Sequence, residues 1–509
     1  MRTMKDSNRP PAFASTTQEV LFVSSVCLAQ ILVEFFVSGF DLLLPAVSED
    51  LEIPSDAQTW PASSFSLVVA CFLLAFGRVT DMVGGKLVYL FGLGWLLIWS
   101  VVCAVSVNEA MLNVARAMQG FGPAAFIPST ISLMGKTYAP GRRKNIVFSL
   151  YGFSAVAGFM IGFFFAGITA QFTTWRWYFG IGAILSALSF GAAVYSIPMD
   201  YSETRAYKAK MDFWGLTVIT SGLILIVYAL IDSSRVTDGW RTPHIPTLFS
   251  IGVVLLVAGF WGEHSPRLTH DNPLLPPSIW RASSFTGLLI SLLFSFGCLG
   301  VFLLYSVFWF DQVLGISAML QVAYFLPLAI GGFVLSLGAG SVLHKVPSTM
   351  LIIFSTLVLV IPPLLFIFMP LDGSISPAQR YWSYIFPSML CATLGIDINF
   401  NIANIYISTT LPVHRQGLAG SLIQATLELG FALALGFAEV ISHGTMRRLT
   451  PLEQASRPGR QAAYTNVFWF EFACAIAAFL LAVAFVRVGA QGGDGDASQG
   501  DRELEPGIT

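Results

Sequence analysis

The chain has 509 residues, of which 55% are hydrophobic and only 11% are charged, and its mean hydropathy is +0.72. Soluble domains carry roughly 25% charged residues, so the composition excludes an ordinary soluble protein. The net charge of −2 also excludes the basic footprint of a nucleic-acid-binding protein. Apolar runs long enough to cross a bilayer recur along the chain, which predicts an all-α polytopic membrane protein.

The apolar runs predict fourteen transmembrane helices, arranged along the chain as six, two and six. An even number of spans places both ends of the chain on one side of the membrane. The predicted spans lie near residues 18–46, 60–79, 87–106, 110–134, 145–171, 175–197, 212–231, 246–262, 284–311, 318–341, 349–369, 381–409, 416–441 and 467–488.

The segments outside the spans divide the chain into five parts. The ends are polar, and the segments that flank the two middle spans are rich in charged residues or proline. We predict a cytoplasmic tail at 1–17, an N-terminal six-helix bundle at 18–197, linkers with two extra transmembrane helices at 198–283, a C-terminal six-helix bundle at 284–488 and a disordered cytoplasmic tail at 489–509.

Charge outside the spans predicts the orientation. Most lysine and arginine residues fall on the side of the N-terminus, which makes that side cytoplasmic. One loop opposes this rule, because Arg447, Arg448, Arg457 and Arg460 fall on the predicted outer side.

A short polar stretch from Gly77 to Lys86 separates the second and third spans. We expect a turn here, in which Gly84 and Gly85 adopt positive φ and Asp81 accepts hydrogen bonds from a neighbouring helix N-terminus. The pattern Gly77-x-x-x-Asp81-x-x-Gly84-x-Lys86 resembles the signature loop of the major facilitator superfamily. This resemblance implies the major facilitator fold of two six-helix bundles, with Gly77, Asp81, Gly84 and Lys86 as a conformational latch.

Three ionisable residues inside the first half are candidates for proton coupling. Glu34 and Asp41 lie seven residues apart, on one face of the first span. Arg116 in the fourth span needs a polar partner within the membrane, and a first-span carboxylate is the expected one. Such a pair makes protonation sensitive to substrate and conformation. The alternatives are an Asp41 that is hydrated near the outer interface and an Arg116 that only holds helices together.

Two further patterns in the first half resemble the same family. Arg116 is followed by Gln119 and Gly120, which is similar to the family motif Arg-x-x-Gln-Gly-x-Gly in the fourth span. The fifth span carries Gly158, Gly162 and Gly167, and small residues of this kind let helices pack or slide closely. Exporters of the family usually have a Gly-Pro pair here, whereas this chain has Gly162-Phe163, and this departure weakens the inference of export.

Polar residues in the second half are concentrated in two spans. Asp397 and Asn401 share one face of the twelfth span, and Gln424 and Glu428 lie one turn apart in the thirteenth. We expect these four residues to line a substrate cavity opposite Glu34, Asp41 and Arg116. The alternative is that they form hydrogen bonds between helices without contacting a substrate.

The chain lacks the signatures of several other classes. No Gly-x-x-x-x-Gly-Lys-Ser/Thr loop occurs, which argues against ATP-driven pumping. The six cysteines fall within predicted spans, and the six histidines fall in predicted loops or at span ends. We therefore expect no metal site, no cofactor and no enzyme activity.

These features predict a proton-coupled secondary active transporter that works by alternating access. The resemblance to the fourteen-span drug:proton antiporters implies export of small toxic compounds, drugs or secondary metabolites. The alternatives are an uptake or efflux carrier for a small inorganic species such as boron or ammonium, and a non-transporting sensor on the same fold. The expected partners are a small-molecule substrate, protons and the lipid bilayer but no nucleic acid, with the chain acting as a monomer in the plasma membrane or, alternatively, the vacuolar membrane.

Overall fold

The computed structural model describes residues 10–54, 57–139, 141–197, 211–236, 238–263, 265, 283–342, 346–410 and 413–486. Most of the two predicted tails and of the charged and proline-containing linkers lies outside these residues. Within the described ranges every regular element is a helix.

The helices follow one another with short connections. Several begin at a side-chain cap: Ser15 accepts a hydrogen bond from the backbone of Gln18, and Asn108 accepts one from Met111. The elements are α1 (Thr16–Asp50), α2 (Trp60–Val83), α3 (Gly85–Ala104), α4 (Glu109–Thr137), α5 (Arg142–Phe172), α6 (Arg176–Ser196), α7 (Phe213–Arg235), η2 (Gly239–Arg241), α8 (His244–Gly262), α11 (Ser283–Phe308), η3 (Trp309–Val313), α12 (Ala318–Val342), α13 (Ser348–Val358), α14 (Ile361–Ile367), α15 (Pro377–Arg380), η4 (Tyr381–Ile385), α16 (Phe386–Thr410), α17 (Val413–Met446), α18 (Pro451–Ala455) and α19 (Arg457–Phe485).

In the described part of the chain, thirteen helical segments are long and apolar enough to cross a membrane, one fewer than the predicted fourteen. The difference is α4, whose apolar run is diluted by polar residues such as Arg116 and Gln119 and by glycine and proline. This helix of 29 residues nevertheless packs against both α2 and α3, so it occupies the position predicted for a span. The predicted class, a polytopic helical membrane protein, is confirmed.

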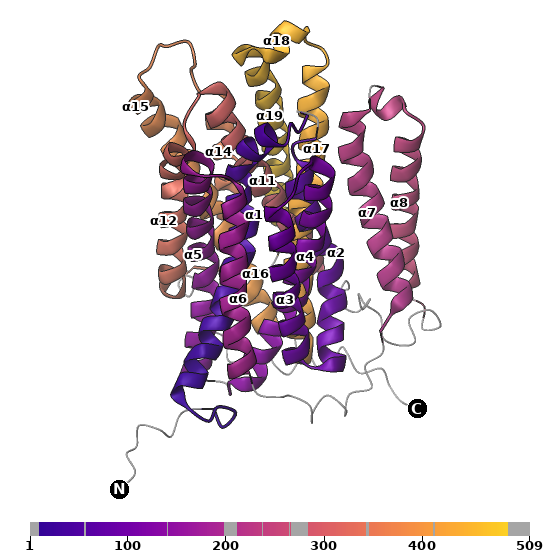
Figure 1. Ribbon diagram of the computed structural model, residues 1–509, viewed down its shortest axis with the longest axis vertical. Helices are drawn as coiled ribbons and strands as arrows, with labels where there is room; N and C mark the ends of the chain where they lie inside the picture. The colour runs from indigo at the N-terminus through magenta and orange to yellow at the C-terminus, as the bar shows by residue number, and fades with distance from the viewer. Residues whose placement is uncertain are drawn as a thin grey trace.

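The helices form two bundles whose corresponding helices make corresponding contacts (Figure 1). In the first, α1 packs on α5 and α6, and α2 packs on α4; in the second, α11 packs on α17 and α19, and α12 packs on α16. Between the bundles α2 contacts α17, and its counterpart α12 contacts α5. These two corresponding contacts, α2 with α17 and α12 with α5, are the ones expected for two parallel repeats. The pair α7 and α8 stands beside the body, where α7 contacts α2 and α17.

The stretch between α2 and α3 is much tighter than the predicted turn. Gly77 and Asp81 belong to α2, and the helical run is interrupted only at Gly84, whose φ is 104°. A side chain would be strained in this conformation, so glycine is required. Gly85 was expected to share the positive φ, but it is the first residue of α3. The expectation was wrong because one residue in this conformation is enough to reverse the chain.

One of the arginines that oppose the charge rule has a structural partner. Arg447, which directly follows α17, donates a hydrogen bond through Nη2 to the backbone carbonyl of Val236, the residue that caps the C-terminus of α7. Since cationic side chains stabilise the carbonyls at a helix C-terminus, this contact ties the extra helix pair to the second bundle. Packing between helices therefore accounts for this arginine, although the charge rule does not.

Glycines set the contact between α1 and α5. A Cβ atom built on Gly158 would lie 2.6 Å from the carbonyl oxygen of Ile31, and one built on Gly162 would lie 2.9 Å from the Cα of Phe35. Both clashes are with backbone, which cannot rotate away. The close approach of the two helices therefore depends on the absence of side chains.

This packing leads to a first prediction. Gly158→Val is expected to lower the stability of the purified protein by roughly 1–3 kcal/mol or more, because α1 and α5 must separate to admit the side chain. Gly152→Val on the same helix is the control, since nothing lies within 4 Å of the Cβ position there. Thermal unfolding in detergent measures both. Equal melting temperatures for the two variants would contradict the packing argument.

Candidate transport site

A cavity of about 160 Å³ lies between the two bundles and is lined by residues of α1, α5, α11, α12, α16 and α17. Its walls are mainly apolar, with the phenyl rings of Phe159, Phe296, Phe400 and Phe431. Six polar side chains reach it: Gln30, Glu34, Thr393, Asp397, Gln424 and Glu428. Among the described residues that line it there is no lysine, arginine or histidine. The cavity therefore combines apolar walls with acidic side chains.

The three carboxyl groups of the cavity come from both halves of the chain. Glu34 is contributed by α1, whereas Asp397 and Glu428 are contributed by α16 and α17. Glu428 and Asp397 both act electrostatically on Glu34. Like charges this close repel one another, so a positive charge in the cavity would be stabilised by these groups.

Hydrogen bonds fix two of these carboxyl groups. Oδ2 of Asp397 accepts a hydrogen bond from the hydroxyl of Thr393, one turn earlier, at 2.8 Å. The side chain of Ser66 on α2 bonds to the carboxyl group of Glu428, although Oε2 of Glu428 has no hydrogen-bond partner. Since Ser66 and Glu428 belong to different bundles, this contact links the two bundles.

Asn401 does not line the cavity, contrary to the prediction for it. Its Nδ2 donates to the backbone carbonyl of Asp397 at 2.8 Å, within the same helix. The prediction assumed that residues on one face of a helix line the same cavity. It was wrong for Asn401 because α16 lies against the cavity over only part of its length. Of the four predicted residues of the second half, Asp397, Gln424 and Glu428 line the cavity.

Arg116 is only 1% exposed, and its partners differ from the expected carboxylate. Nε donates to the carbonyl of Pro61 at 3.0 Å, Nη1 to Oε1 of Gln119 at 2.8 Å and Nη2 to the carbonyl of Phe36 at 2.9 Å. Its guanidinium also lies over the rings of Phe40 and Phe65, at 4.1 and 4.5 Å. Arg116 thus joins α1, α2 and α4 through backbone carbonyls.

The neighbours of Arg116 complete this buried network. Gln119 extends the hydrogen-bond network to α3, because its Nε2 donates to the hydroxyl of Ser100 at 2.8 Å. A Cβ atom on Gly120 would lie 2.6 Å from the carbonyl oxygen of Phe65, so this glycine allows α4 to pack closely on α2. The Arg-x-x-Gln-Gly pattern therefore serves the contact of four helices of the first bundle.

Asp41 is buried as well, with 4% of its surface exposed, and is not hydrated at the outer interface. It interacts electrostatically with Arg116, yet no carboxylate oxygen lies within 4.0 Å of the Arg116 nitrogens in the described part of the chain. Asp41 and Arg116 do not line the cavity. The predicted group of Glu34, Asp41 and Arg116 is therefore split between the cavity and the interior of the first bundle.

The residues of the predicted latch also have separate surroundings. A Cβ atom on Gly77 would lie 3.7 Å from Pro128 of α4 and 3.7 Å from the hydroxyl of Ser421 on α17, so this glycine sits at the contact between the bundles. Nζ of Lys86 donates at 2.5 Å to the carbonyl of Ile197, at the end of α6. Asp81 is exposed, with Arg78 and Lys136 as its charged neighbours.

The sequence analysis did not single out several carboxyl groups that the structure buries, and two of them lie within spans of the second bundle. Glu439 on α17 is 3% exposed and Glu471 on α19 is 1% exposed. Both lie within predicted spans, so the rule that singled out Glu34 also applied to them. Glu439 is eleven residues from Glu428, which places it on the same face of α17 three turns further out.

An all-helical body of two repeated bundles, with a charged cavity at their interface, defines a multi-pass membrane transporter. The sequence model described as "Major Facilitator Superfamily" matches residues 26–435, and this chain belongs to that superfamily. It is therefore a transporter and not an enzyme, and the family resemblance in the sequence is confirmed.

Comparisons with individual proteins agree on the family. The chain is 29% identical over 463 residues to the "Efflux pump terJ" of Aspergillus terreus, covering 89% of this chain and 86% of the pump. It is 30% identical over 432 residues to the "Low affinity ammonium transporter" of Saccharomyces cerevisiae, covering 83% and 81%. An auto-inhibited peptide transporter of the POT family has a similar fold, with a TM-score of 0.62 over 93% of this chain and 98% of that chain at 15% identity.

Proposed function

We propose that this protein is a proton-coupled antiporter that exports small amphipathic organic compounds, of the kind represented by drugs and secondary metabolites. The observation that carries the proposal is the cavity itself, in which four phenyl rings and three carboxyl groups face one space. The rings suit an apolar body, and the carboxyl groups suit both a proton and a basic substrate. The efflux pump among the relatives supports the direction of transport.

In this proposal Glu34 and Glu428 carry the coupled protons, and Asp397 and Gln424 contact the substrate. Arg116 and Asp41 keep α1, α2 and α4 together while the bundles rock. Gly77, at the contact of α2 with α17, and Asp81, Gly84 and Lys86 next to it form the latch that holds the cytoplasmic ends of the bundles together. The plasma membrane is the proposed location, which suits a carrier that removes toxic compounds from the cell.

A second candidate, a carrier of ammonium, is favoured by one specific observation. The cavity of about 160 Å³ is smaller than the roughly 300–1,000 Å³ of pockets for drug-sized ligands, so it fits a very small substrate without rearrangement. A relative of equal similarity is named as an ammonium transporter. The phenyl rings and the apolar majority of the wall favour the organic substrate instead.

Purified protein in sealed vesicles with an imposed pH gradient distinguishes these candidates. We expect aromatic amines added one at a time to discharge the gradient faster than in protein-free vesicles, whereas an ammonium salt does not exceed that baseline. Discharge by ammonium alone would replace the proposal with the second candidate. Transport of a compound without any movement of protons would disprove proton coupling.

A further inference from the structure

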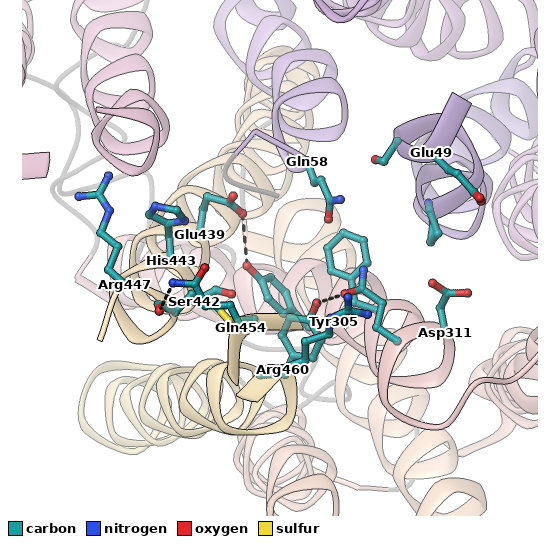
Figure 2. Close-up of a pocket in the computed structure, with 16 residues that line it drawn as sticks. Glu49, Gln58, Tyr305, Asp311, Glu439, Ser442, His443, Arg447, Gln454 and Arg460 are labelled. Carbon is teal, nitrogen blue, oxygen red and sulfur yellow. Dashed lines mark hydrogen bonds between the residues drawn. The ribbon is translucent and has the colours of Figure 1, made fainter. Parts of the chain in front are cut away.

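A second and larger cavity lies at the outer end of the molecule, and we call it the outer vestibule (Figure 2). Its volume is about 690 Å³, and its lining residues come from the ends of α1, α11 and α17, from η3, and from the beginning of α19. It opens between the two bundles on the side opposite the Gly84 break. Its size falls in the range of pockets that hold drug-sized ligands.

Two carboxylates that come from different bundles lie at one side of the vestibule. Glu49 is at the end of α1, and Asp311 is in η3. The two repel each other electrostatically, and both are exposed to solvent. Neither makes an ion pair within 4.0 Å to another described residue. The pair therefore places two carboxylates without a close ion pair near each other, and Figure 2 shows both side chains.

A third carboxylate lies deeper, against aromatic rings. Glu439 is 3% exposed, and its Oε2 accepts a hydrogen bond from the hydroxyl of Tyr305 at 3.4 Å. Tyr464 packs edge to face on Tyr305 and stacks on Phe308, with ring centroids 5.7 and 6.1 Å apart. Carboxylates beside aromatic faces are the surroundings that cationic ligands prefer.

Two arginines and a histidine also line the vestibule, namely Arg447, Arg460 and His443. The Arg447 guanidinium is engaged with the Val236 carbonyl on the side of α7. Arg460 acts electrostatically on Asp311 but is not in an ion pair with it. In addition, Ser48 lines the vestibule at 5% exposure, and its hydroxyl oxygen has no hydrogen-bond partner. A buried polar group of this kind is costly unless a water or ligand satisfies it.

We propose that the outer vestibule is a second binding site, which takes an organic cation. Its charged nitrogen lies among Glu439, Glu49 and Asp311, and its apolar part lies against Tyr305 and Tyr464. Glu428 of the central cavity and Glu439 are three turns apart on α17, about 16 Å along the helix, so the two sites are separate. The inference concerns binding alone and holds for either direction of transport.

A cation in this site also bears on the closing of the outer side. Because Glu49 and Asp311 belong to opposite bundles and repel each other, a positive charge between them removes a force that holds the bundles apart. A cation bound here therefore favours the approach of the two bundles on this side of the molecule, and its departure removes that effect.

Binding of benzyltrimethylammonium to the purified protein in detergent, measured by calorimetry, tests this inference. This probe carries a permanent charge, and benzyl alcohol is the uncharged aromatic control. We expect two sites in the wild type. Glu439→Gln is expected to weaken one of them by roughly tenfold or more, since truncating one partner of a buried charge contact costs this much. Asp311→Asn is expected to weaken the same site by a smaller factor.

Variants of the central cavity distinguish the two sites. Glu428→Gln is expected to weaken the other site and leave the Glu439-dependent one intact. Asp311 is exposed, so Asp311→Asn is expected to fold. This variant therefore still tests the vestibule site if Glu439→Gln is unstable. A single site that is lost in Glu428→Gln and unaffected by Asp311→Asn would disprove the proposal. Equal binding of benzyl alcohol at the Glu439-dependent site would disprove recognition of charge.

Discussion

Arg116→Ala is expected to reduce transport to the level of protein-free vesicles and to lower the melting temperature of the purified protein. The side chain donates to carbonyls of α1 and α2 and to Gln119. Its removal leaves buried acceptors without their charged donor, which costs roughly 2–5 kcal/mol in total. Transport per folded molecule, measured in vesicles, and thermal unfolding in detergent check the two parts.

The matched control is Arg176→Ala, because Arg176 makes an exposed ion pair with Asp50 at 2.7 Å. Exposed pairs contribute about 0–1 kcal/mol, so this variant should melt close to the wild type. Arg116→Lys keeps the charge but not the planar fork that reaches three acceptors, and is expected to remain impaired. Wild-type transport by Arg116→Ala would remove Arg116 from the mechanism. A normal melting temperature for it would refute its role in joining the helices.

Glu34→Gln is expected to abolish the accumulation of substrate that a pH gradient drives. With a gradient of about one pH unit, each coupled proton supports at most about a tenfold concentration ratio, and the variant should fall to a ratio near one. The physical reason is that Glu34 is the carboxyl group through which the first bundle faces Asp397 and Glu428. Substrate exchange without a gradient should continue, because the glutamine amide fills the same space as the carboxyl group.

Glu19→Gln on the same helix is the control for this experiment. Glu19 is bound to Arg143 at 2.6 Å near the beginning of α1, far from the cavity. Its variant should retain gradient-driven accumulation. If Glu34→Gln accumulates substrate as the wild type does, Glu34 carries no coupled proton, and Glu428 becomes the residue to replace next.

Local patterns were sufficient for the membrane class and for nearly all of the spans. Insertion depends on the hydropathy of a single continuous segment, and this can be evaluated without knowing its neighbours. The same reasoning explains why α4 is the weakest span, since Arg116 and Gln119 are tolerated only because other helices satisfy them. The family motifs also indicated a repeated six-helix bundle, and the exchange of contacts between α2 with α17 and α12 with α5 agrees with it.

The sequence by itself determined that this protein is a helical, multi-pass transporter of the major facilitator type, with ionisable groups inside its spans. Only the tertiary structure decided which of these groups meet. Arg116 donates hydrogen bonds to backbone carbonyls and forms no ion pair with a carboxylate, and Asn401 donates to a carbonyl of its own helix. Glu34 lies close enough to Glu428, in the other bundle, for the two side chains to interact electrostatically. Partners of a buried polar group come from helices distant in the chain, so no local pattern can specify them, and their arrangement follows from how the bundles pack.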